Sequence, residues 1–314
     1  MTTPNHVELL CLGEPLVEFN QQSDGRFLKG FGGDVSNVAI SAARQNANTG
    51  LISKIGDDSF GQDLKALWED EGVLHDHVLV DSGHETGLYF VTHDTQGHHF
   101  SYRRTHSAAR NFGPGDLPLA TLSQAKMFYA SGISLAVSAD MGAAVDEAAR
   151  ITKSGGGLFA FDPNLRTRLW PLEEARHTTH AVMELCDLAL PSLEDATQLT
   201  GYDDPEQIVA FYHTLGAVEV VLTMGSQGVL VSNGTSTAHV PPIAVMPQDA
   251  TGAGDCFNGA FLAERLRGSS ALEAAEWANV AAALSTQRFG AVAPIPTFSQ
   301  TLKHIERTGE HHVN

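Results

Sequence analysis

One stretch decides the fold of this chain: Asp249-Ala-Thr-Gly-Ala-Gly-Asp-Cys-Phe-Asn-Gly-Ala-Phe261. Its glycines at positions 252 and 254 let the backbone turn sharply and come close to a ligand. Phe257 and Phe261 are four residues apart, so they lie on one apolar face of a helix that begins at the glycines. The first N–H groups of a helix have no intrahelical partner and carry the positive end of its dipole. The stretch therefore predicts an anion site suited to a phosphoryl group.

Asp255 lies in the first turn of this predicted helix. We expect the helix dipole to keep its carboxylate ionised. An ionised carboxylate beside a bound phosphate is better suited to accept a proton from an attacking hydroxyl than to hold the phosphate. The amides of Gly252, Ala253 and Gly254 would then form an anion hole. Gly-x-Gly-Asp by itself also fits a simple helix cap, and the longer motif favours the catalytic interpretation.

That longer motif, Asp-x-Thr-Gly-Ala-Gly-Asp at 249–255, resembles the C-terminal signature of the ribokinase-like, or PfkB, family of sugar kinases. In that family the last Asp is the catalytic base and the glycine turn is the anion hole. Residue 250 is Ala where the family usually has Thr, and this change affects neither feature. The resemblance implies an α/β protein of ribokinase-like fold, with a doubly wound, mainly parallel sheet and a small β-sheet lid.

A second glycine turn, Gly32-Gly-Asp-Val-Ser-Asn37, resembles the N-terminal signature of the same family. There the glycines let the sugar approach the backbone and the polar residues bond its hydroxyls, which implies that Gly33, Asp34 and Asn37 bind substrate. The alternative is a glycine turn capped by Asp34. The resemblance covers nearly the whole chain, from Leu12 to about Ala293.

Composition narrows the classes of protein to consider. The length of 314 residues, with 42% hydrophobic residues, allows one large α/β domain or two smaller ones, and we expect a single domain over 1–314. The formal charge of −18 argues against nucleic acid and anionic membranes as partners. Cys11, Cys186 and Cys256 are scattered, which favours a reducing cytoplasm over a disulfide framework or zinc site. We expect neither a signal peptide nor a membrane span, and assign none of the 15 histidines to a metal.

Apolar runs predict the strands of the sheet. Val7–Leu12 has the continuous apolar character of a strand covered on both faces. Gly50–Gly56 predicts a strand and Ser59–Glu71 a helix, with a structural turn between them. From Lys126 onward, strands and helices alternate, which favours a doubly wound parallel sheet. The strands expected there are Met127–Ala130, Leu158–Asp162, Asp187–Leu190 and Val218–Met224.

Thr86–Thr92 and His98–Arg104 alternate in polarity around the turn Asp94-Thr-Gln-Gly97, which predicts a hairpin. With short strand-like pieces near the N-terminus, the hairpin would build a small projecting sheet. In the family this sheet is the lid over the sugar, and here it would comprise about 15–32 and 76–106. Its closure would exclude water, which competes with the sugar hydroxyl for the phosphoryl group. We also expect a homo-oligomer, with a dimer formed through the lid.

The ATP site is expected at the carboxyl ends of the main strands. The chain has no GxxxxGK motif, which disfavours a P-loop kinase. The resemblance implies that the phosphates and ribose contact Asn164, Ser192 and the turn at 223–228, and that Asn279 lines the adenine pocket. In that turn the implied contacts are Thr223, Gly225, Ser226 and Gly228.

The same family resemblance implies two metal sites. Asp195 stands at the position of an acid that organises Mg²⁺ in many family members, but here the acid is one methylene shorter, so we expect contact through water. Ser192 to Ala196 alone also fits a helix N-cap. Asp249 matches an acid at a monovalent cation (K⁺) site of some members. ATP and Mg²⁺ are the expected cofactors.

The substrate is indicated by three short strings, Gly32-Gly-Asp34, Tyr102-Arg-Arg104 and Asp162-Pro-Asn-Leu-Arg166, which resemble the 2-keto-3-deoxygluconate kinases. A keto acid carries a carboxylate that Arg104 and Arg166 could bind with two donors each. Alternatively, these arginines pair with the surplus acids.

Tyr89 and Tyr102 would add hydroxyls and ring faces from the lid. We therefore expect phosphorylation of the terminal (6-) hydroxyl of 2-keto-3-deoxygluconate, with the gluconate or galactonate epimer left open. A kinase for a neutral hexose such as fructose is the alternative. A sugar-binding or regulatory protein without activity is the alternative from another class, and the intact Asp255 counts against it.

Overall fold

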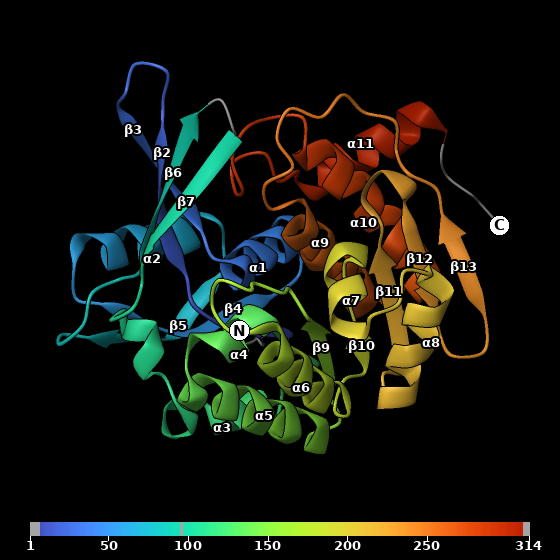
Figure 1. Cartoon of the computed structure of the whole chain (residues 1–314), viewed down its shortest axis with the longest axis horizontal. Coiled ribbons are helices and arrows are strands. Elements are labelled where there is room, and N and C mark those ends of the chain that lie inside the picture. The colour runs from blue at the N-terminus through green and yellow to red at the C-terminus, as the bar shows by residue number, and fades with distance from the viewer. Residues whose placement is uncertain (1–6, 95–96, 310–314) are drawn as a thin grey trace, which may run out of the picture.

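The computed structural model describes residues 7–94 and 97–309, and its central feature is a nine-stranded sheet (Figure 1). The strand order is β13-β12-β11-β10-β9-β8-β1-β4-β5. All neighbours from β11 to β5 are parallel, and the last two strands, β12 and β13, add to one edge in antiparallel fashion. The strands are β1 (Leu9–Leu12), β4 (Thr49–Gly56), β5 (Leu74–Asp81), β8 (Met127–Ser131), β9 (Leu158–Asp162), β10 (Leu188–Ala189), β11 (Glu219–Thr223), β12 (Val229–Ser232) and β13 (Thr237–Val240). The predicted doubly wound, mainly parallel sheet is confirmed.

Helices cover both faces of this sheet (Figure 1). Alternate side chains of β1 enter opposite cores: Leu9 and Cys11 point to one side, and Leu10 and Leu12 to the other. Burial on both sides explains why the run is continuously apolar. One face packs against α1 (Asp34–Arg44), α2 (Ser59–Asp70), α9 (Ala253–Arg267) and α10 (Ala271–Ser285). The other packs against α5 (Ala139–Ser154), α6 (Leu172–Met183), α7 (Leu193–Thr200) and α8 (Pro205–Leu215). Short helices α3 (Leu119–Leu122) and α4 (Gly132–Val137) lie near α5, and α11 (Phe298–Thr308) packs on α10.

A separate four-stranded sheet projects from the main body, in the order β3-β2-β6-β7 (Figure 1). Its strands are β2 (Leu16–Gln21), β3 (Phe27–Gly32), β6 (Leu88–Asp94) and β7 (Gly97–Arg103). β6 and β7 form the predicted antiparallel hairpin, whose turn residues 95–96 lie outside the described part of the chain. We call this small sheet the lid sheet.

The second segment of the lid was predicted to begin at residue 76, and that boundary is wrong. Leu74–Asp81 forms β5, which pairs in parallel with β4 at the edge of the main sheet. The reason is the crossover through α2, which returns the chain alongside β4 and allows Val78 to join the main core. The lid sheet takes only β6 and β7 from this part of the chain.

Helices α1 and α9 pack closely against each other along their middle turns. Gly259 of α9 faces α1 so closely that any Cβ there would overlap the carbonyl oxygen of Val38. Ser41 of α1 donates its hydroxyl to the carbonyl of Cys256 over 2.8 Å. This close approach of the two backbones brings together two helices that carry predicted site residues. Asp34 and Asn37 lie in α1, and Asp255 lies in α9.

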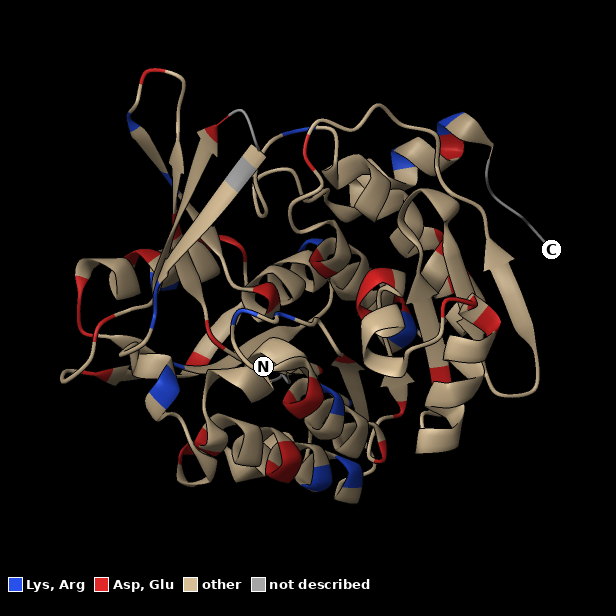
Figure 2. Cartoon of the chain, viewed as in Figure 1, with Lys and Arg blue, Asp and Glu red and all other residues tan. Residues whose placement is uncertain are grey.

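Charged residues occur on most elements of the fold (Figure 2). Figure 2 shows single Lys and Arg residues among more numerous acids over the described chain, in keeping with the formal charge of −18. Within residues 7–94 and 97–309, none of the helices combines the length and the apolar character needed to cross a membrane.

Candidate active site

A cleft of 680 Å³ lies between the lid sheet and the carboxyl ends of the main strands. It brings together most of the residues predicted to form the site, from segments that are far apart in the sequence. The predicted residues that line it are Gly33, Asp34, Asn37, Tyr89, Tyr102, Arg104, Asn164, Arg166, Ser192, Asp195, Thr223, Gly252, Ala253, Gly254 and Asp255. Gly225, Ser226, Gly228, Asn279 and Asp249 are not among the residues that line it.

The glycine turn forms one wall of the cleft. Gly252 is the N-cap of α9 with φ 73°, in the left-handed region that favours glycine, and a Cβ there would lie 3.1 Å from Ala291. Ala253 donates its N–H to the carbonyl of Ala250 over 3.1 Å, which closes the turn. The following first-turn amides, of Gly254 and Asp255, have no carbonyl four residues back within the helix. These amides are therefore the ones suited to an incoming anion.

Asp249 stabilises the same turn through hydrogen bonds. Its Oδ1 accepts hydrogen bonds from the Thr251 amide at 3.0 Å and hydroxyl at 2.6 Å, and its Oδ2 accepts from the Gly290 amide at 2.9 Å. Asp249 borders a second cavity of 730 Å³, which also touches Glu18 of the lid sheet. The acid thus ties the turn to the 290 segment, and its side chain lies outside the main cleft.

Asp255 lies in the first turn of α9 and is partly accessible from the cleft. Asn37 donates its side-chain amide to Asp255 Oδ2 over 2.8 Å. Burial by the surrounding protein, and then the charge of Asp34, raise the pKa of Asp255 to about 7, while Asn37 and Arg166 oppose that rise. A proton acceptor with a pKa near neutrality is well suited to general base catalysis.

This pKa corrects the expectation that the helix dipole keeps Asp255 ionised. The dipole at a helix end contributes about 0.3–1 kcal/mol at the surface and up to about 2 kcal/mol where the group is partly buried, and one pKa unit corresponds to about 1.4 kcal/mol. The dipole alone therefore lowers a pKa by no more than about 1.5 units. Lost hydration and the neighbouring Asp34 outweigh it.

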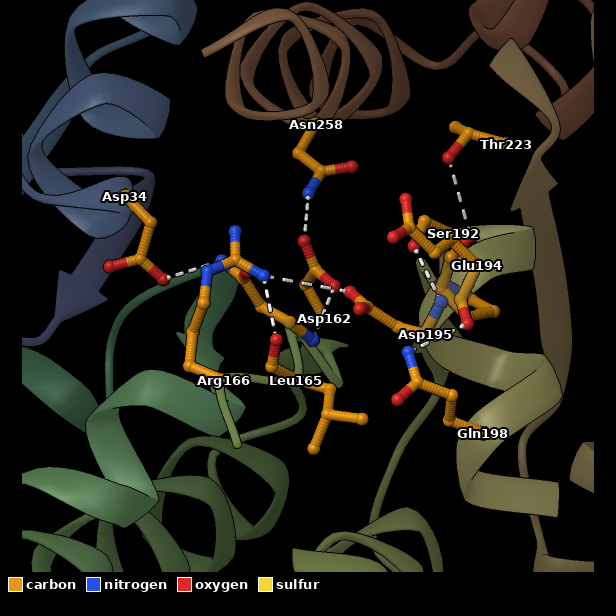
Figure 3. Close-up of polar contacts among 12 residues, drawn as sticks. Asp34, Asp162, Leu165, Arg166, Ser192, Glu194, Asp195, Gln198, Thr223 and Asn258 are labelled. Carbon is orange, nitrogen blue, oxygen red and sulfur yellow. Dashed lines mark hydrogen bonds and ion pairs between the residues drawn. The ribbon is translucent and has the colours of Figure 1, made fainter. Parts of the chain in front are cut away.

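Two residues that sequence reasoning did not assign, Asp162 and Asn258, lie on the floor of the cleft. Asn258 of α9 points at Asp162, at the end of β9, and donates to its Oδ2 over 2.8 Å (Figure 3). Asp162 Oδ1 accepts the backbone amide of Asn164 at 2.9 Å. Burial, and then the charge of Asp195, raise the pKa of Asp162 well above its usual value. A signal for Asn258 was present, since Asp255 and Asn258 repeat the spacing of Asp34 and Asn37.

Asn164 joins β9 to α1. Its backbone has φ 31°, a positive value that asparagine tolerates better than most residues. Its side-chain amide donates to Asp34 Oδ2 over 3.0 Å. The residue predicted to touch the nucleotide is therefore bonded to one predicted to touch the sugar.

The two predicted carboxylate-binding arginines are in different states. Arg104 is 9% exposed and forms an ion pair with Glu14, which is completely buried and also accepts a hydrogen bond from the Ser107 hydroxyl. Burial raises the pKa of Glu14, and Arg104 counteracts this effect. The alternative interpretation, that an arginine pairs with an acid of the chain, thus applies to Arg104. Glu14 follows the end of β1, and sequence reasoning missed its role as this partner.

Arg166 is more open to the cleft, with a side chain that is 51% exposed. Its Nη1 lies 3.9 Å from Asp195 Oδ2 and donates to the carbonyl of Leu165 over 2.7 Å (Figure 3). A long, exposed ion pair contributes little and can exchange for a ligand. The neighbouring Arg168 reaches the lid, where its Nη1 donates to the carbonyl of Phe100 over 3.2 Å.

Aromatic side chains of the lid sheet form the opposite wall. The Tyr89 and Tyr102 rings stack with centroids 5.7 Å apart. The Tyr89 hydroxyl donates to Glu18 Oε2 over 2.5 Å, so toward the cleft it can act as an acceptor. Burial raises the pKa of Glu18, and this hydrogen bond opposes the rise. Tyr102, at 37% exposure, offers an accessible ring face.

The predicted nucleotide-binding residues extend beyond the cleft along the sheet edge. Ser192 caps α7 by accepting the Asp195 amide at 3.2 Å, as its local sequence predicted. Gly228 has φ 89°, and any Cβ there would overlap the Val240 carbonyl. Asn279 donates to the adjoining carbonyl of Pro241 over 2.7 Å. The 225–228 turn and Asn279 therefore meet beside 240–241, at the edge of the sheet where β11, β12 and β13 lie.

Among the described residues, no group of three or more His, Cys, Asp or Glu side chains is arranged to hold a metal ion. Asp195 lines the cleft beside Glu194, and burial raises the pKa of Asp195 while Arg166 counteracts this. Mg²⁺ commonly keeps several waters and is held by one or two carboxylates together with substrate phosphates. The donor set at Asp195 fits that mode.

The parallel sheet, the cleft at the ends of its strands, and a helix N-terminus with an adjacent carboxylate define a phosphotransferase acting on a small molecule. Sequence comparison makes the class specific: the pfkB family carbohydrate kinases match residues 8–298. The chain belongs to the pfkB family of carbohydrate kinases.

Relatives with different substrates are equally similar. The chain is 33% identical over 316 residues to Fructokinase-1 of Zea mays, with 95% of this chain and 98% of the relative covered. It is also 33% identical over 309 residues to the 2-dehydro-3-deoxygluconokinase of Dickeya dadantii, with 94% and 98% covered. A proposed ribokinase II from E. coli, solved in complex with ATP and Mg²⁺, superposes with a TM-score of 0.87 at 29% identity, covering 96% of this chain and 99% of that one. The ribokinase-like fold is therefore confirmed.

Proposed function

We propose that this sugar kinase transfers the γ-phosphoryl group of ATP to the terminal (6-) hydroxyl of 2-keto-3-deoxygluconate. The observation that carries the proposal is Arg166, a half-exposed guanidinium in the cleft that is close enough to Asp255 to affect its pKa. A planar guanidinium binds a carboxylate through two parallel hydrogen bonds. A sugar acid held by Arg166 would present its carboxylate there and leave its far hydroxyl for the reaction.

In the proposed reaction, Asp255 takes the proton of the sugar hydroxyl as the hydroxyl oxygen bonds to the γ-phosphorus. The bond from that phosphorus to the oxygen bridging to ADP breaks, and ADP leaves with the electron pair. The first-turn amides of Gly254 and Asp255, with the turn at Gly252 and Ala253, stabilise the charge on the transferring group. Asp34 and Asn37 would bond the sugar hydroxyls, and Tyr89 and Tyr102 would cover the sugar from the lid.

ATP would lie along the edge of the sheet. Asn164, Ser192 and Thr223 would face its phosphates, and the turn with Gly225, Ser226 and Gly228 would approach the ribose. Asn279 would line the adenine pocket. Mg²⁺, when bound, neutralises phosphate charge, and Asp195 would hold it through water. The solved relative in complex with ATP and Mg²⁺ supports this part of the proposal.

The same proposal includes features that the sequence resemblance implied. A monovalent cation such as K⁺ would bind beside Asp249, where it would stiffen the glycine turn. The lid sheet would close over the sugar, and two copies of the chain would associate through it, in a cytoplasmic protein of one domain with a lid. Replacing K⁺ by Na⁺ in the assay tests the cation, and sedimentation tests the dimer.

The ion pair between Arg104 and Glu14 favours a second candidate, a kinase for a neutral hexose such as fructose. The pair engages the Arg104 guanidinium with an acid of the chain, so this arginine is not a free cation for a substrate carboxylate, and a neutral sugar needs none. The equal identity to a fructokinase is in keeping with this candidate. A sugar-binding protein without activity is the third, and sugar-dependent ATP turnover would exclude it.

A coupled assay of ATP consumption over a panel of sugars and 2-keto acids tests the proposal. We expect the highest kcat/KM with 2-keto-3-deoxygluconate or its galactonate epimer. A higher kcat/KM with fructose would replace the sugar acid by the neutral hexose.

A further inference from the structure

Three hydrogen bonds between aspartate and asparagine side chains form a closed ring on the floor of the cleft. Each of three segments supplies one aspartate and one asparagine. These are Asp34 and Asn37 from α1, Asp162 and Asn164 from the end of β9, and Asp255 and Asn258 from α9. The side-chain amide of Asn37 in α1 donates to the carboxylate of Asp255 in α9 over 2.8 Å. The side-chain amide of Asn258 in α9 donates to Asp162 at the end of β9 over 2.8 Å. The side-chain amide of Asn164, which follows β9, donates to Asp34 in α1 over 3.0 Å. Every segment is thus donor to one neighbour and acceptor from the other.

Local structure makes this ring possible. In both helices the aspartate and the asparagine are three residues apart, a spacing that places them on the same helix face. At β9 the chain leaves the strand with the positive φ of Asn164, which points its amide toward α1. The backbone N–H of Asn164 bonds to Asp162 Oδ1 in the same turn.

Asp34 and Asp255 have roles in the proposed function, and Asp162 and Asn258 have none. Asp162 is 8% exposed and Asn258 is 2% exposed, so both polar groups have lost nearly all contact with water. Buried polar groups are costly unless their hydrogen bonds are made. Both oxygens of Asp162 are engaged, one with the Asn164 backbone and one with Asn258 (Figure 3).

We propose that Asp162 and Asn258 are positioning residues, whose hydrogen bond fixes the catalytic end of α9 against the end of β9. The inference rests on the proposed role of Asp255 as the base. Asn258 lies about one helical turn beyond Asp255, so its attachment to β9 sets where Asp255 stands relative to Asn164 and Asp34. A displacement of about 1 Å at a reacting group can lower the rate about 100-fold.

Exchange of the two side chains tests the inference. In Asp162→Asn an amide replaces a carboxylate that accepts on both oxygens, so its NH2 group meets the NH2 group of Asn258, and the bond re-forms only when the Asn258 amide turns over to present its oxygen. In Asn258→Asp two carboxyl groups face each other. The double variant Asp162→Asn/Asn258→Asp can restore both bonds, with the introduced amide accepting from Asn164 and donating to the introduced carboxylate. It also keeps the total charge.

We expect Asn258→Asp to lower kcat roughly 10- to 100-fold and Asp162→Asn to lower it less, with KM for ATP and for the best sugar of the panel changed little in both. The double variant should recover kcat to within about fivefold of the wild type, which is the coupling expected of residues in contact. Ser41→Ala is the matched control, because it removes another buried hydrogen bond between α1 and α9, the one to the Cys256 carbonyl. We expect this control to lower Tm and leave kcat nearly unchanged.

Three results would overturn the inference: a folded double variant with kcat as low as that of Asn258→Asp, a double variant that does not fold, or a control that loses as much kcat as Asn258→Asp. If the single variants do not fold, the double variant still decides. Asp255→Asn separates this inference from the proposed function. If it retains turnover, Asp255 is not the base, while recovery of Tm in the double variant still measures the bond between Asp162 and Asn258.

Discussion

Asn37 and Asp255 are 218 positions apart in the chain, and the side-chain amide of Asn37 donates to the carboxylate of Asp255 over 2.8 Å. The bond joins the helix that carries the proposed sugar-binding residues to the helix that carries the proposed base. It also favours the charged form of Asp255, against the burial and the Asp34 charge that favour the neutral form. Asn37, a residue of the proposed sugar site, thus contributes to the ionisation of the base.

The first prediction concerns the base itself. Asp255→Asn should lower kcat by about 10²- to 10⁴-fold, the usual contribution of a general base. KM for ATP and sugar should change little, since an amide of the same size fills the site. Steady-state kinetics with the best substrate of the panel measures both quantities. Near-normal turnover in the variant would remove Asp255 from the chemistry.

The second prediction concerns pH. Asp255 must be ionised to accept a proton, and its pKa is raised to about 7. We expect kcat/KM to rise with pH up to about 7 and to level off above it, with a slope of about one decade per pH unit on the acid side. Asn37→Ala removes a hydrogen bond that lowers this pKa, so the acid limb should move to higher pH. A limb that moves to lower pH would contradict the assignment.

Local motifs predicted the catalytic turn and the helix starts well, because a glycine turn, a helix N-terminus and the first-turn acid are encoded within a few residues. The same holds for the βα alternation and the hairpin of β6 and β7. The boundary of the lid could not be predicted in this way. Whether Leu74–Asp81 joins the lid or the main sheet depends on where the α2 crossover returns the chain.

Properties that depend on contacts between distant parts of the chain could not be predicted from the sequence. The pKa of Asp255 is set by burial and by Asp34, which is far away in the chain. The partner of Arg104 is Glu14, and no spacing rule connects them. Asp162 and Asn258 meet only because β9 and α9 pack together. The sequence therefore predicts the reacting groups better than the contacts that adjust them.

The third prediction concerns stability at the turn before α2. Asp58 caps α2 by accepting the Gly61 amide at 2.8 Å, and it also accepts the Thr86 amide at 2.8 Å. Burial pushes the pKa of Asp58 upward, but hydrogen bonds from Thr86 and Gly61 outweigh it and lower the pKa overall. Asp58→Ala should lower the free energy of unfolding by about 0.5–2 kcal/mol.

The pH dependence of that effect follows from the lowered pKa. A carboxylate whose folded pKa lies below its unfolded value of about 3.9 stabilises the fold fully above that value. Its contribution is lost as pH falls through the folded pKa of Asp58. The difference in Tm between Asp58→Ala and the wild type should therefore be present at pH 7 and shrink in strong acid. A difference that grows on acidification would be evidence against this cap.

The fourth prediction concerns the lid sheet. If it closes on substrate, ligand should slow hydrogen exchange of the amides of β6 and β7 more than that of the buried strand β1. Tyr89 and Tyr102 lie on these lid strands and face the cleft, so the contact is direct. Exchange measured by mass spectrometry with and without saturating sugar and a non-hydrolysable ATP analogue tests this. Equal exchange in the lid strands under both conditions would exclude closure.

The last prediction separates the two candidate substrates through Arg104, Arg166 and the neighbouring Arg168. Arg166 is 51% exposed with a long ion pair to Asp195, so its removal should change stability little. Its removal also raises the pKa of Asp255, an effect that the two substrates share. Hydrogen bonds to charged groups contribute about 1.5–3 kcal/mol, so Arg166→Ala should lower kcat/KM for the sugar acid about 10- to 100-fold. Fructose has no carboxylate, and residual activity toward it should change less. Arg166→Lys should recover only part, because an ammonium lacks the planar fork.

Arg104→Ala should behave differently, because it leaves Glu14 buried without its cation. Breaking a buried pair in this way is destabilising by about 3–5 kcal/mol, so Tm should fall and both substrates should be affected. Arg168→Ala is the control for Arg166, since it removes a guanidinium from the same cleft whose hydrogen bond goes to the Phe100 carbonyl. If Arg166→Ala impairs fructose and the sugar acid equally, or no more than Arg168→Ala does, then Arg166 does not bind a substrate carboxylate. The neutral hexose would then be the better assignment.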